Sequence, residues 1–177
     1  MTRLGAILAG GKSSRFGSDK AEAMLDGRPL VEHVFAGLRN QCDEIVLCGR
    51  EREGMTSLPD RPGPDQGPLG GLNAALHHAA ERGHDEVLSA ACDNAGLPAD
   101  LADQLSPPPA YADGQPVIGL WPAHLAPLLD DWMARQDNRA MMGWIDACGA
   151  RSVRLKEKPA NINQPEDLTE LEDRHGL

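Results

Sequence analysis

The stretch LAGGKSSRFGSDK, from Leu8 to Lys20, sets glycines, serines and basic side chains directly behind a short apolar run. That run, Leu4 to Leu8, is typical of a buried strand in a parallel sheet. Gly10 and Gly11 let the backbone turn without a Cβ and expose successive N–H groups, as a loop that cradles phosphate requires. Positive charge near the loop comes from Lys12, Arg15 and Lys20. The sequence therefore predicts an anion-binding loop after the first strand.

The loop differs from the common nucleotide-binding motifs, because GxxxxGK[ST] and GxGxxG are both absent. For two glycines alone, a turn with solvated basic residues is the simpler interpretation. The whole stretch, however, resembles the signature LAGGxSxRMGxDK of the nucleotidyltransferases that activate sugars and cofactors. Within that group it is most similar to the molybdenum cofactor guanylyltransferases.

Length and charge limit the possible functions. The 177 residues suffice for one domain, expected to span 1–177, and the formal net charge is −10. An acidic chain of this kind is not expected to bind nucleic acid, where a basic face is needed. The first twenty residues nevertheless hold four basic residues and one acid, which indicates a focused anion site.

Neither a secretory signal nor a membrane segment is expected, because no apolar run approaches the required length. The chain is therefore expected to be cytoplasmic and to have no membrane partner. The four cysteines show no CxxC pairing or zinc-ligand spacing, so we expect reduced thiols in or near the core. They are Cys42, Cys48, Cys92 and Cys148.

Strand-like runs alternate with helical patterns along the chain. The predicted strands are Leu4 to Ala9, Glu44 to Cys48, Glu86 to Ala91, Pro116 to Leu120 and Ser152 to Leu155. Amphipathic helices are predicted over Leu30 to Leu38 and Pro68 to Glu81, where apolar residues recur at three- and four-residue intervals. This order favours a Rossmann-like, three-layer α/β/α fold with a mostly parallel sheet. In such a sheet the ligand lies at the carboxyl ends of the strands.

Asp93 follows a predicted strand and is the candidate metal ligand. A lone aspartate there could equally be a turn or helix cap. Its context ACDNAGLP resembles the family's PCDxPxLP motif, with Ala91 and Ala95 in place of prolines. Nucleotidyl transfer uses a divalent ion, and Mg²⁺ prefers one or two carboxylates together with phosphates and waters.

Asp60 lies seven residues before Gly67 of GPLGG, the spacing at which the family places an aspartate that binds the guanine nucleotide. A carboxylate can accept from the N1–H and the exocyclic amine of guanine together. The alternative is a solvated turn residue. The family also carries an asparagine at the end of the second strand, where this chain has Leu47. Two explanations are open. Either main chain contacts the base at that strand end, or the assignment of a guanine nucleotide is weaker than the other motifs suggest.

Near the C-terminus, residues 161–168 resemble the family's NxNTPEDL element, with Gln164 in place of threonine. Asn161 and Asn163 would point the same way on an extended segment and could hold a pterin; as an isolated pair they would more often be turn or cap residues. Gln115 stands where the family commonly has histidine, so that role does not transfer. His77 and His78 lie on a predicted helix and are expected to be solvated or packed, without a carboxylate partner.

The resemblance implies an enzyme that transfers GMP from GTP to the phosphate of molybdopterin with Mg²⁺ as cofactor, in the nucleotide-diphospho-sugar transferase fold. Its partners would be these two substrates and cofactor-delivery or acceptor molybdoenzyme proteins. The implied catalytic residues are Arg15, Lys20 and Asp93. The implied nucleotide-binding residues are Leu8, Ala9, Gly10, Gly11, Lys20, Asp60 and Asp93.

Three alternatives are weighed against this function. One is a cytidylyltransferase acting on the same pterin, another is a related nucleotidyltransferase, and the third is a non-catalytic GTP-binding adaptor of cofactor delivery. The cytidine-specific group usually carries LAAG where this chain has LAGG. This difference and the NIN element favour guanine over cytosine as the base. Lys20 and Asp93 together favour an enzyme, because a binder does not need the metal carboxylate.

Overall fold

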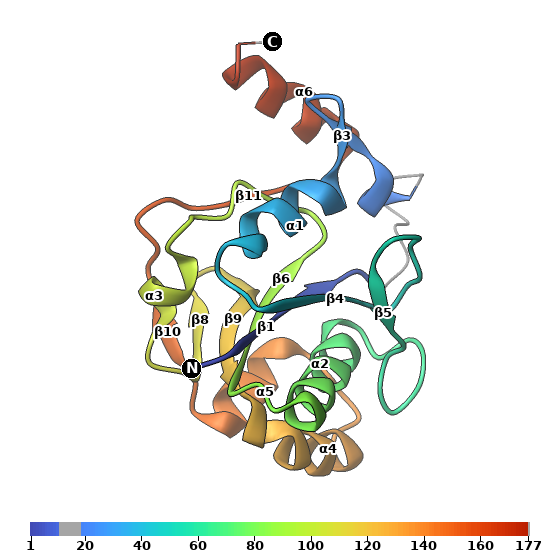
Figure 1. Cartoon of the computed structure of the whole chain (residues 1–177), viewed down its shortest axis with the longest axis vertical. Coiled ribbons are helices and arrows are strands. Elements are labelled where there is room, and N and C mark those ends of the chain that lie inside the picture. Colours follow the sequence, from blue (N-terminus) through green and yellow to red (C-terminus); the bar gives the residue numbers. More distant parts are fainter. Residues whose placement is uncertain (11–18, 177) are drawn as a thin grey trace.

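The computed structural model describes residues 1–10 and 19–176 and is built around a seven-stranded sheet (Figure 1). The strand order is β10-β8-β9-β6-β1-β4-β5. The strands are β1 (Arg3–Leu8), β4 (Glu44–Cys48), β5 (Thr56–Leu58), β6 (Glu86–Ala91), β8 (Ala110–Ala112), β9 (Gln115–Pro122) and β10 (Arg151–Val153). Strands β5, β4, β1 and β6 are parallel, whereas β9 pairs antiparallel with both β6 and β8. The predicted mostly parallel sheet is confirmed.

Helices cover both faces of this sheet. They are α1 (Leu30–Arg39), α2 (Pro68–Arg82), α3 (Leu101–Leu105), α4 (Ala126–Arg135) and α5 (Met141–Cys148). A further helix, α6 (Pro165–Arg174), lies away from the sheet at one end of the molecule. Alternate residues of a strand face opposite sides, so β1 contributes to two cores. Leu4 and Leu8 pack with α2, α4 and α5, while Ile7 packs with α1 and α3. The result is the predicted three-layer α/β/α architecture.

The two helices predicted from periodicity form at nearly the predicted positions. Helix α2 begins with Pro68 in its first turn and ends at Gly83, whose left-handed backbone (φ 78°) lets its N–H reach the carbonyls of Ala79 and Ala80. Strand β9 is longer than predicted, and β5 and β8 were missed. Each of these two has three residues, too few for an alternating pattern to be recognised.

A third, smaller core joins the two ends of the chain. It packs the hairpin of β2 (Met24–Leu25) and β3 (Arg28–Pro29) against α6, with β7 (Asn94–Ala95) and β11 (Ala160–Asn161) beside it. The backbone N–H of Asp26 donates to Glu172 Oε1 at 3.0 Å, and His175 Nδ1 lies 2.6 Å from Asp26 Oδ2. Figure 1 shows α6 over this hairpin, at the end of the molecule opposite α4.

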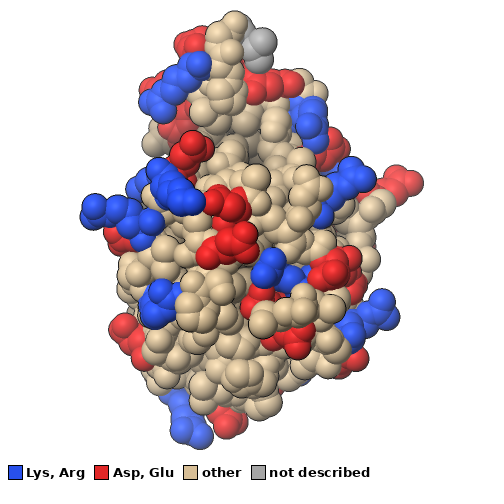
Figure 2. Space-filling view, turned by 60° about the vertical axis from the view of Figure 1, so that its left-hand side comes forward, with Lys and Arg blue, Asp and Glu red and all other residues tan. Residues whose placement is uncertain are grey.

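The cysteine prediction is confirmed, since all four thiols are free and Cys48 is buried. No helix in the described part of the chain is long and apolar enough to cross a membrane. On the face drawn in Figure 2, the basic and acidic side chains of the described residues are interspersed. That face presents mixed charge, not a continuous basic surface.

Candidate active site

The carboxyl ends of β1, β4 and β6 meet at one edge of the sheet. There the N–H of Ala9 donates to the carbonyl of Cys48 at 2.9 Å, and the N–H of Cys92 donates to the carbonyl of Leu8 at 3.1 Å. These bonds place Leu8, Ala9 and Gly10 between the segments that follow β4 and β6. Gly11, Lys12 and Arg15 lie outside the described residues.

Lys20 and Asp93 form an ion pair at this edge. Lys20 Nζ lies 2.5 Å from Asp93 Oδ2, and the two side chains are 19% and 12% exposed. Lys20 begins a short 3₁₀ helix, η1 (Lys20–Glu22), whose N-cap Asp19 accepts from the N–H of Ala21 at 3.2 Å. The structure thus brings together two predicted site residues that are far apart in the sequence.

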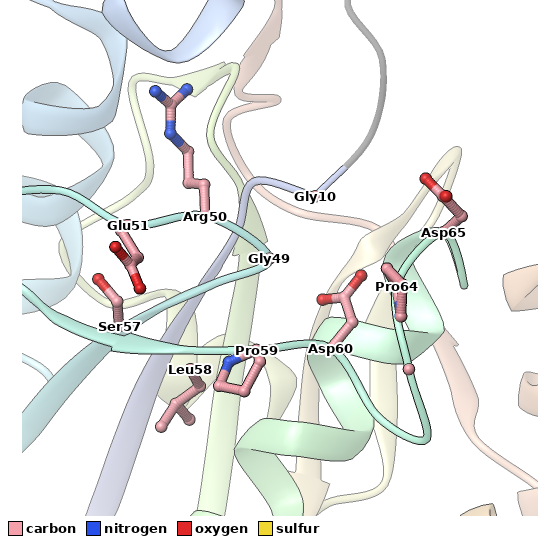
Figure 3. Close-up of a pocket in the computed structure, with 11 residues that line it drawn as sticks. Gly10, Gly49, Arg50, Glu51, Ser57, Leu58, Pro59, Asp60, Pro64 and Asp65 are labelled. Carbon is pink, nitrogen blue, oxygen red and sulfur yellow. The ribbon is translucent and has the colours of Figure 1, made fainter.

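A cavity of about 490 Å³ opens beside the glycine loop (Figure 3). Gly10, Gly49 and Asp60 are among its lining residues, and the Asp60 carboxylate points toward the two glycines. Oδ1 of Asp60 is buried and has no hydrogen-bond partner among residues 1–10 and 19–176. Burial, followed by the charge of Asp65, raises the pKa of Asp60 above its ordinary value. The cavity therefore holds an acceptor whose hydrogen bonding is incomplete.

Close backbone approach in the cavity explains why glycine is present at two of these positions. A Cβ at Gly49 would lie 2.5 Å from Cα of Gly10, and Gly49 has φ 86°. A Cβ at Gly10 would lie 3.0 Å from Asp60 Oδ2. Leu47, where the family has asparagine, is fully buried in the core below α1. Main chain at Gly49 lines the cavity instead of a side chain from position 47.

The asparagine-containing segment lies against Asp93. Asn161 pairs with Asn94 across β11 and β7, and the N–H of Ile162 donates to the carbonyl of Asp93 at 3.2 Å. Asn161 and Asn163 are exposed, while Ile162 between them is buried. The backbone N–H groups of Asn163 and Gln164 both donate to Asp167 Oδ2 at 2.8 Å. The first turn of α6 thus holds the segment beside the Lys20–Asp93 pair.

Sequence reasoning missed two arginines in the loop after β4. Arg50 forms a two-pronged ion pair with Asp19, and Arg52 bonds Glu22 and Glu32 at 2.8 and 2.9 Å. The available signal was their position just beyond the carboxyl end of a predicted strand.

Other polar residues of the family pattern lie elsewhere. Gln115 is buried and donates to the carbonyl of Pro159 at 2.8 Å. The expectation that His77 and His78 have no carboxylate partner was wrong. Their Nε2 atoms lie 2.7 Å from Asp130 and 2.9 Å from Glu44, both on other elements. Helical spacing could not reveal these pairs because the carboxylates come from α4 and β4.

A divalent cation at this edge would need oxygen ligands from the side chains around Asp93. Within residues 1–10 and 19–176, no three His, Cys, Asp or Glu side chains gather in an arrangement that could hold a metal. Asp93 supplies one carboxylate at the strand edge, next to a lysine suited to phosphate. This fits Mg²⁺, which takes most of its remaining ligands from phosphates and water.

The fold and the residues at its carboxyl edge are those of a nucleotidyltransferase. Comparison with known proteins identifies the family within this class. The profile of the MobA-like NTP transferase domain family matches residues 5–151. Proteins named molybdenum cofactor guanylyltransferase are similar over nearly the whole length. The protein of Cereibacter sphaeroides is 37% identical, and the match covers 97% of this chain and 96% of that protein. The protein of Rhodobacter capsulatus is 36% identical, and the match covers 96% of this chain and 95% of that protein. The chain belongs to the MobA-like NTP transferase family.

Solved structures agree with this fold. Molybdopterin-guanine dinucleotide biosynthesis protein A from Archaeoglobus fulgidus superposes with a TM-score of 0.75 at 21% identity, covering 98% of both chains. A CMP:2-keto-3-deoxy-manno-octonic acid synthetase complexed with CTP gives 0.73 at 10% identity, covering 99% of both. At these identities the likeness concerns the fold alone.

Proposed function

We propose that this enzyme transfers GMP from GTP to the phosphate of molybdopterin, forming molybdopterin guanine dinucleotide and pyrophosphate. The observation that carries the proposal is that the Lys20–Asp93 pair and the cavity lined by Asp60 lie at the same carboxyl edge of the sheet. The names of the family's curated relatives support the same activity.

The base is assigned to the cavity. Guanine offers N1–H and an exocyclic amine on one edge, and an ionised Asp60 can accept both hydrogen bonds. Because Asp60 is partly desolvated, these bonds form in a region where water competes weakly. Gly10 and Gly49 bring main chain against the ligand.

The triphosphate is assigned to the glycine loop and Lys20. Lys20 neutralises charge on the phosphates, and the N–H of Gly10 contributes a donor. The roles of Gly11 and Arg15 remain predictions from the sequence motif. Asp93 would hold Mg²⁺, which when bound neutralises charge that concentrates on the α-phosphate and the leaving pyrophosphate.

The acceptor is assigned to Asn161 and Asn163, which would hold the pterin. An oxygen of the molybdopterin phosphate attacks the α-phosphorus of GTP, and the bond from that phosphorus to the β-bridging oxygen breaks. Pyrophosphate leaves with the electron pair of that bond, without a covalent enzyme intermediate. Positioning and charge neutralisation supply most of the rate.

The test is nucleotide-dependent product formation. The protein with Mg²⁺ and molybdopterin should release pyrophosphate and form a dinucleotide with GTP, and do so several-fold less effectively with CTP, ATP or UTP. Nucleotide binding is measured on the same preparation by thermal shift. Faster turnover with CTP would assign a cytidylyltransferase, equal turnover with both would contradict the guanine preference, and GTP binding without pyrophosphate release would assign an adaptor.

A further inference from the structure

We propose that Arg50 is a positioning residue that fixes Lys20 to the wall of the nucleotide cavity through Asp19. The inference rests on the proposed function, because it concerns the lysine assigned to the triphosphate. Arg50 is assigned no contact with substrate; it acts through the chain of contacts from the β4–β5 loop to η1.

The first link joins Arg50 to Asp19. Both terminal nitrogens of Arg50 donate to the two carboxylate oxygens of Asp19, a geometry that fixes orientation as well as distance. The bonds lower the pKa of Asp19 and raise that of Arg50, so the two shifts agree in direction. Since the Asp19 side chain is 45% exposed, the pair contributes little to overall stability. Its contribution is geometric.

The second link runs from Asp19 to Lys20. Oδ1 of Asp19 accepts from the N–H of Ala21, so Asp19 caps η1 directly before Lys20, its first residue. Lys20 then reaches Asp93 at 2.5 Å. Moving Asp19 would move the backbone that carries the lysine.

A second arginine of the same loop anchors the other end of η1. Arg52 Nε donates to Glu22 Oε1 at 2.8 Å, while its Nη2 donates to Glu32 Oε1 on α1 at 2.9 Å. Hydrogen bonds to Glu22 and Glu32 raise the pKa of Arg52. The loop therefore holds η1 at Asp19 and at Glu22, on both sides of Lys20.

The same loop forms part of the nucleotide cavity. Gly49, Arg50 and Glu51 line it together with Asp60, and in Figure 3 the Arg50 side chain points away from Asp60. A nucleotide seated in the cavity thus contacts the loop from which the lysine is held. This arrangement couples occupation of the base site to the position of the phosphate-binding charge.

The experiment compares Arg50→Gln with Arg3→Gln. Arg3 also pairs with a carboxylate, Glu86, but at the amino end of β1, on the opposite edge of the sheet. Arg50→Gln should lower turnover at saturating GTP and molybdopterin by roughly ten- to 100-fold, since small misplacements of a charge are costly in catalysis. Arg3→Gln should lower the melting temperature but leave turnover within about two-fold. Arg50→Lys keeps the charge without the fork and should restore only part of the rate.

A second background separates positioning from direct contact. With Lys20→Ala already present, Arg50→Gln should cost less than about two-fold further, because a residue acting through Lys20 has nothing left to position. The same fold loss in both backgrounds would mean that Arg50 acts on substrate itself and would overturn the inference. Unchanged turnover in Arg50→Gln would also overturn it.

An activity-independent measurement keeps this inference separate from the proposed function. Amide hydrogen exchange over residues 19–25, without nucleotide, should be faster in Arg50→Gln than in the parent and unchanged in Arg3→Gln. Unaltered exchange in Arg50→Gln would show that the pair does not hold η1. If exchange rises while the parent protein fails to release pyrophosphate with GTP, the proposed function fails and the positioning contact stands.

Discussion

Asp60 is placed where folding and binding make opposite demands. Burial raises its pKa, so the ionised form is costly in the protein without ligand, whereas the proposed binding of guanine requires that form. Asp60→Asn should therefore weaken GTP binding by roughly ten-fold or more while raising the melting temperature by about 2 °C. Thermal shift with and without GTP measures both effects.

The gain in stability should depend on pH with a definite sign. The stability gained by Asp60→Asn should be complete at pH values above the raised pKa of Asp60. It should disappear below pH 3.8, the ordinary pKa, because the parent carboxyl group is then protonated in both folded and unfolded chains. The exposed Asp131→Asn on α4 serves as the control, because that carboxylate neither lines the cavity nor contributes to the raised pKa of Asp60. A destabilised Asp60→Asn protein would contradict this account.

Asp93 tests the step after binding. Asp93→Asn keeps size and hydrogen-bonding capacity but removes the charge that would hold Mg²⁺, so pyrophosphate release should nearly vanish while GTP still binds. Equilibrium binding and pyrophosphate release are compared on one preparation. Release at the parental rate would reduce Asp93 to a cap at the end of β6.

Single residues differed in how well the sequence predicted them. Asp60 and Asp93 were recognised from motifs with fixed spacing. In the structure Asp60 lines the cavity and Asp93 pairs with Lys20, while the roles of both residues remain predictions. Arg50 belongs to no motif that the sequence reasoning used, because its partner Asp19 is 31 positions away. A contact of that kind requires the relative placement of two loops, which periodicity does not contain.

At the scale of elements, α6 positions the proposed pterin segment from its first turn. The N–H groups of Asn163 and Gln164 lower the pKa of Asp167, which stays ionised through the neutral range. Asp167→Ala should release this segment, raising KM for molybdopterin several-fold with little change in GTP binding. Steady-state kinetics with each substrate varied in turn provides the measurement.

The neighbouring Glu166 provides the matched control. It is exposed and lies in the same first turn, so Glu166→Ala should leave both KM values within about two-fold. Equal loss of GTP and pterin binding in Asp167→Ala would instead indicate that the segment shapes the whole edge of the sheet.

Elements with long apolar periodicity were predicted closely, and short or reversed ones were not. Helix α1 shows the three- and four-residue spacing of its buried face, with Leu30, Val34 and Leu38 fully buried. Strand β9 was predicted, but the pattern of a strand does not state its direction. Its antiparallel pairing with β8 follows from the tight connection through Gly114, at φ 74°, whereas its antiparallel pairing with β6 is set by the packing of the whole sheet.

For the whole molecule, thiol reactivity reports the integrity of the core. Burial raises the pKa of Cys42 and Cys92 to about 12, and that of Cys48 and Cys148 in the same direction. Native protein at pH 8 should react slowly with a thiol reagent, and all four thiols should react quickly in denaturant. Mass spectrometry of the alkylated protein counts them. Fast modification of Cys92 alone in the native protein would show that the site edge opens.

The small third core has a consequence for biosynthesis. Asp26, in the hairpin that follows Lys20, bonds Glu172, which is 146 positions later. Strands β1, β4 and β6 leave the ribosome long before α6 does, so the central part of the sheet can assemble while the hairpin still lacks its packing partner. The enzyme therefore completes the surroundings of Lys20, the lysine proposed to bind phosphate, only when translation is nearly finished. A chain stalled before residue 160 would retain the cavity residues without that support.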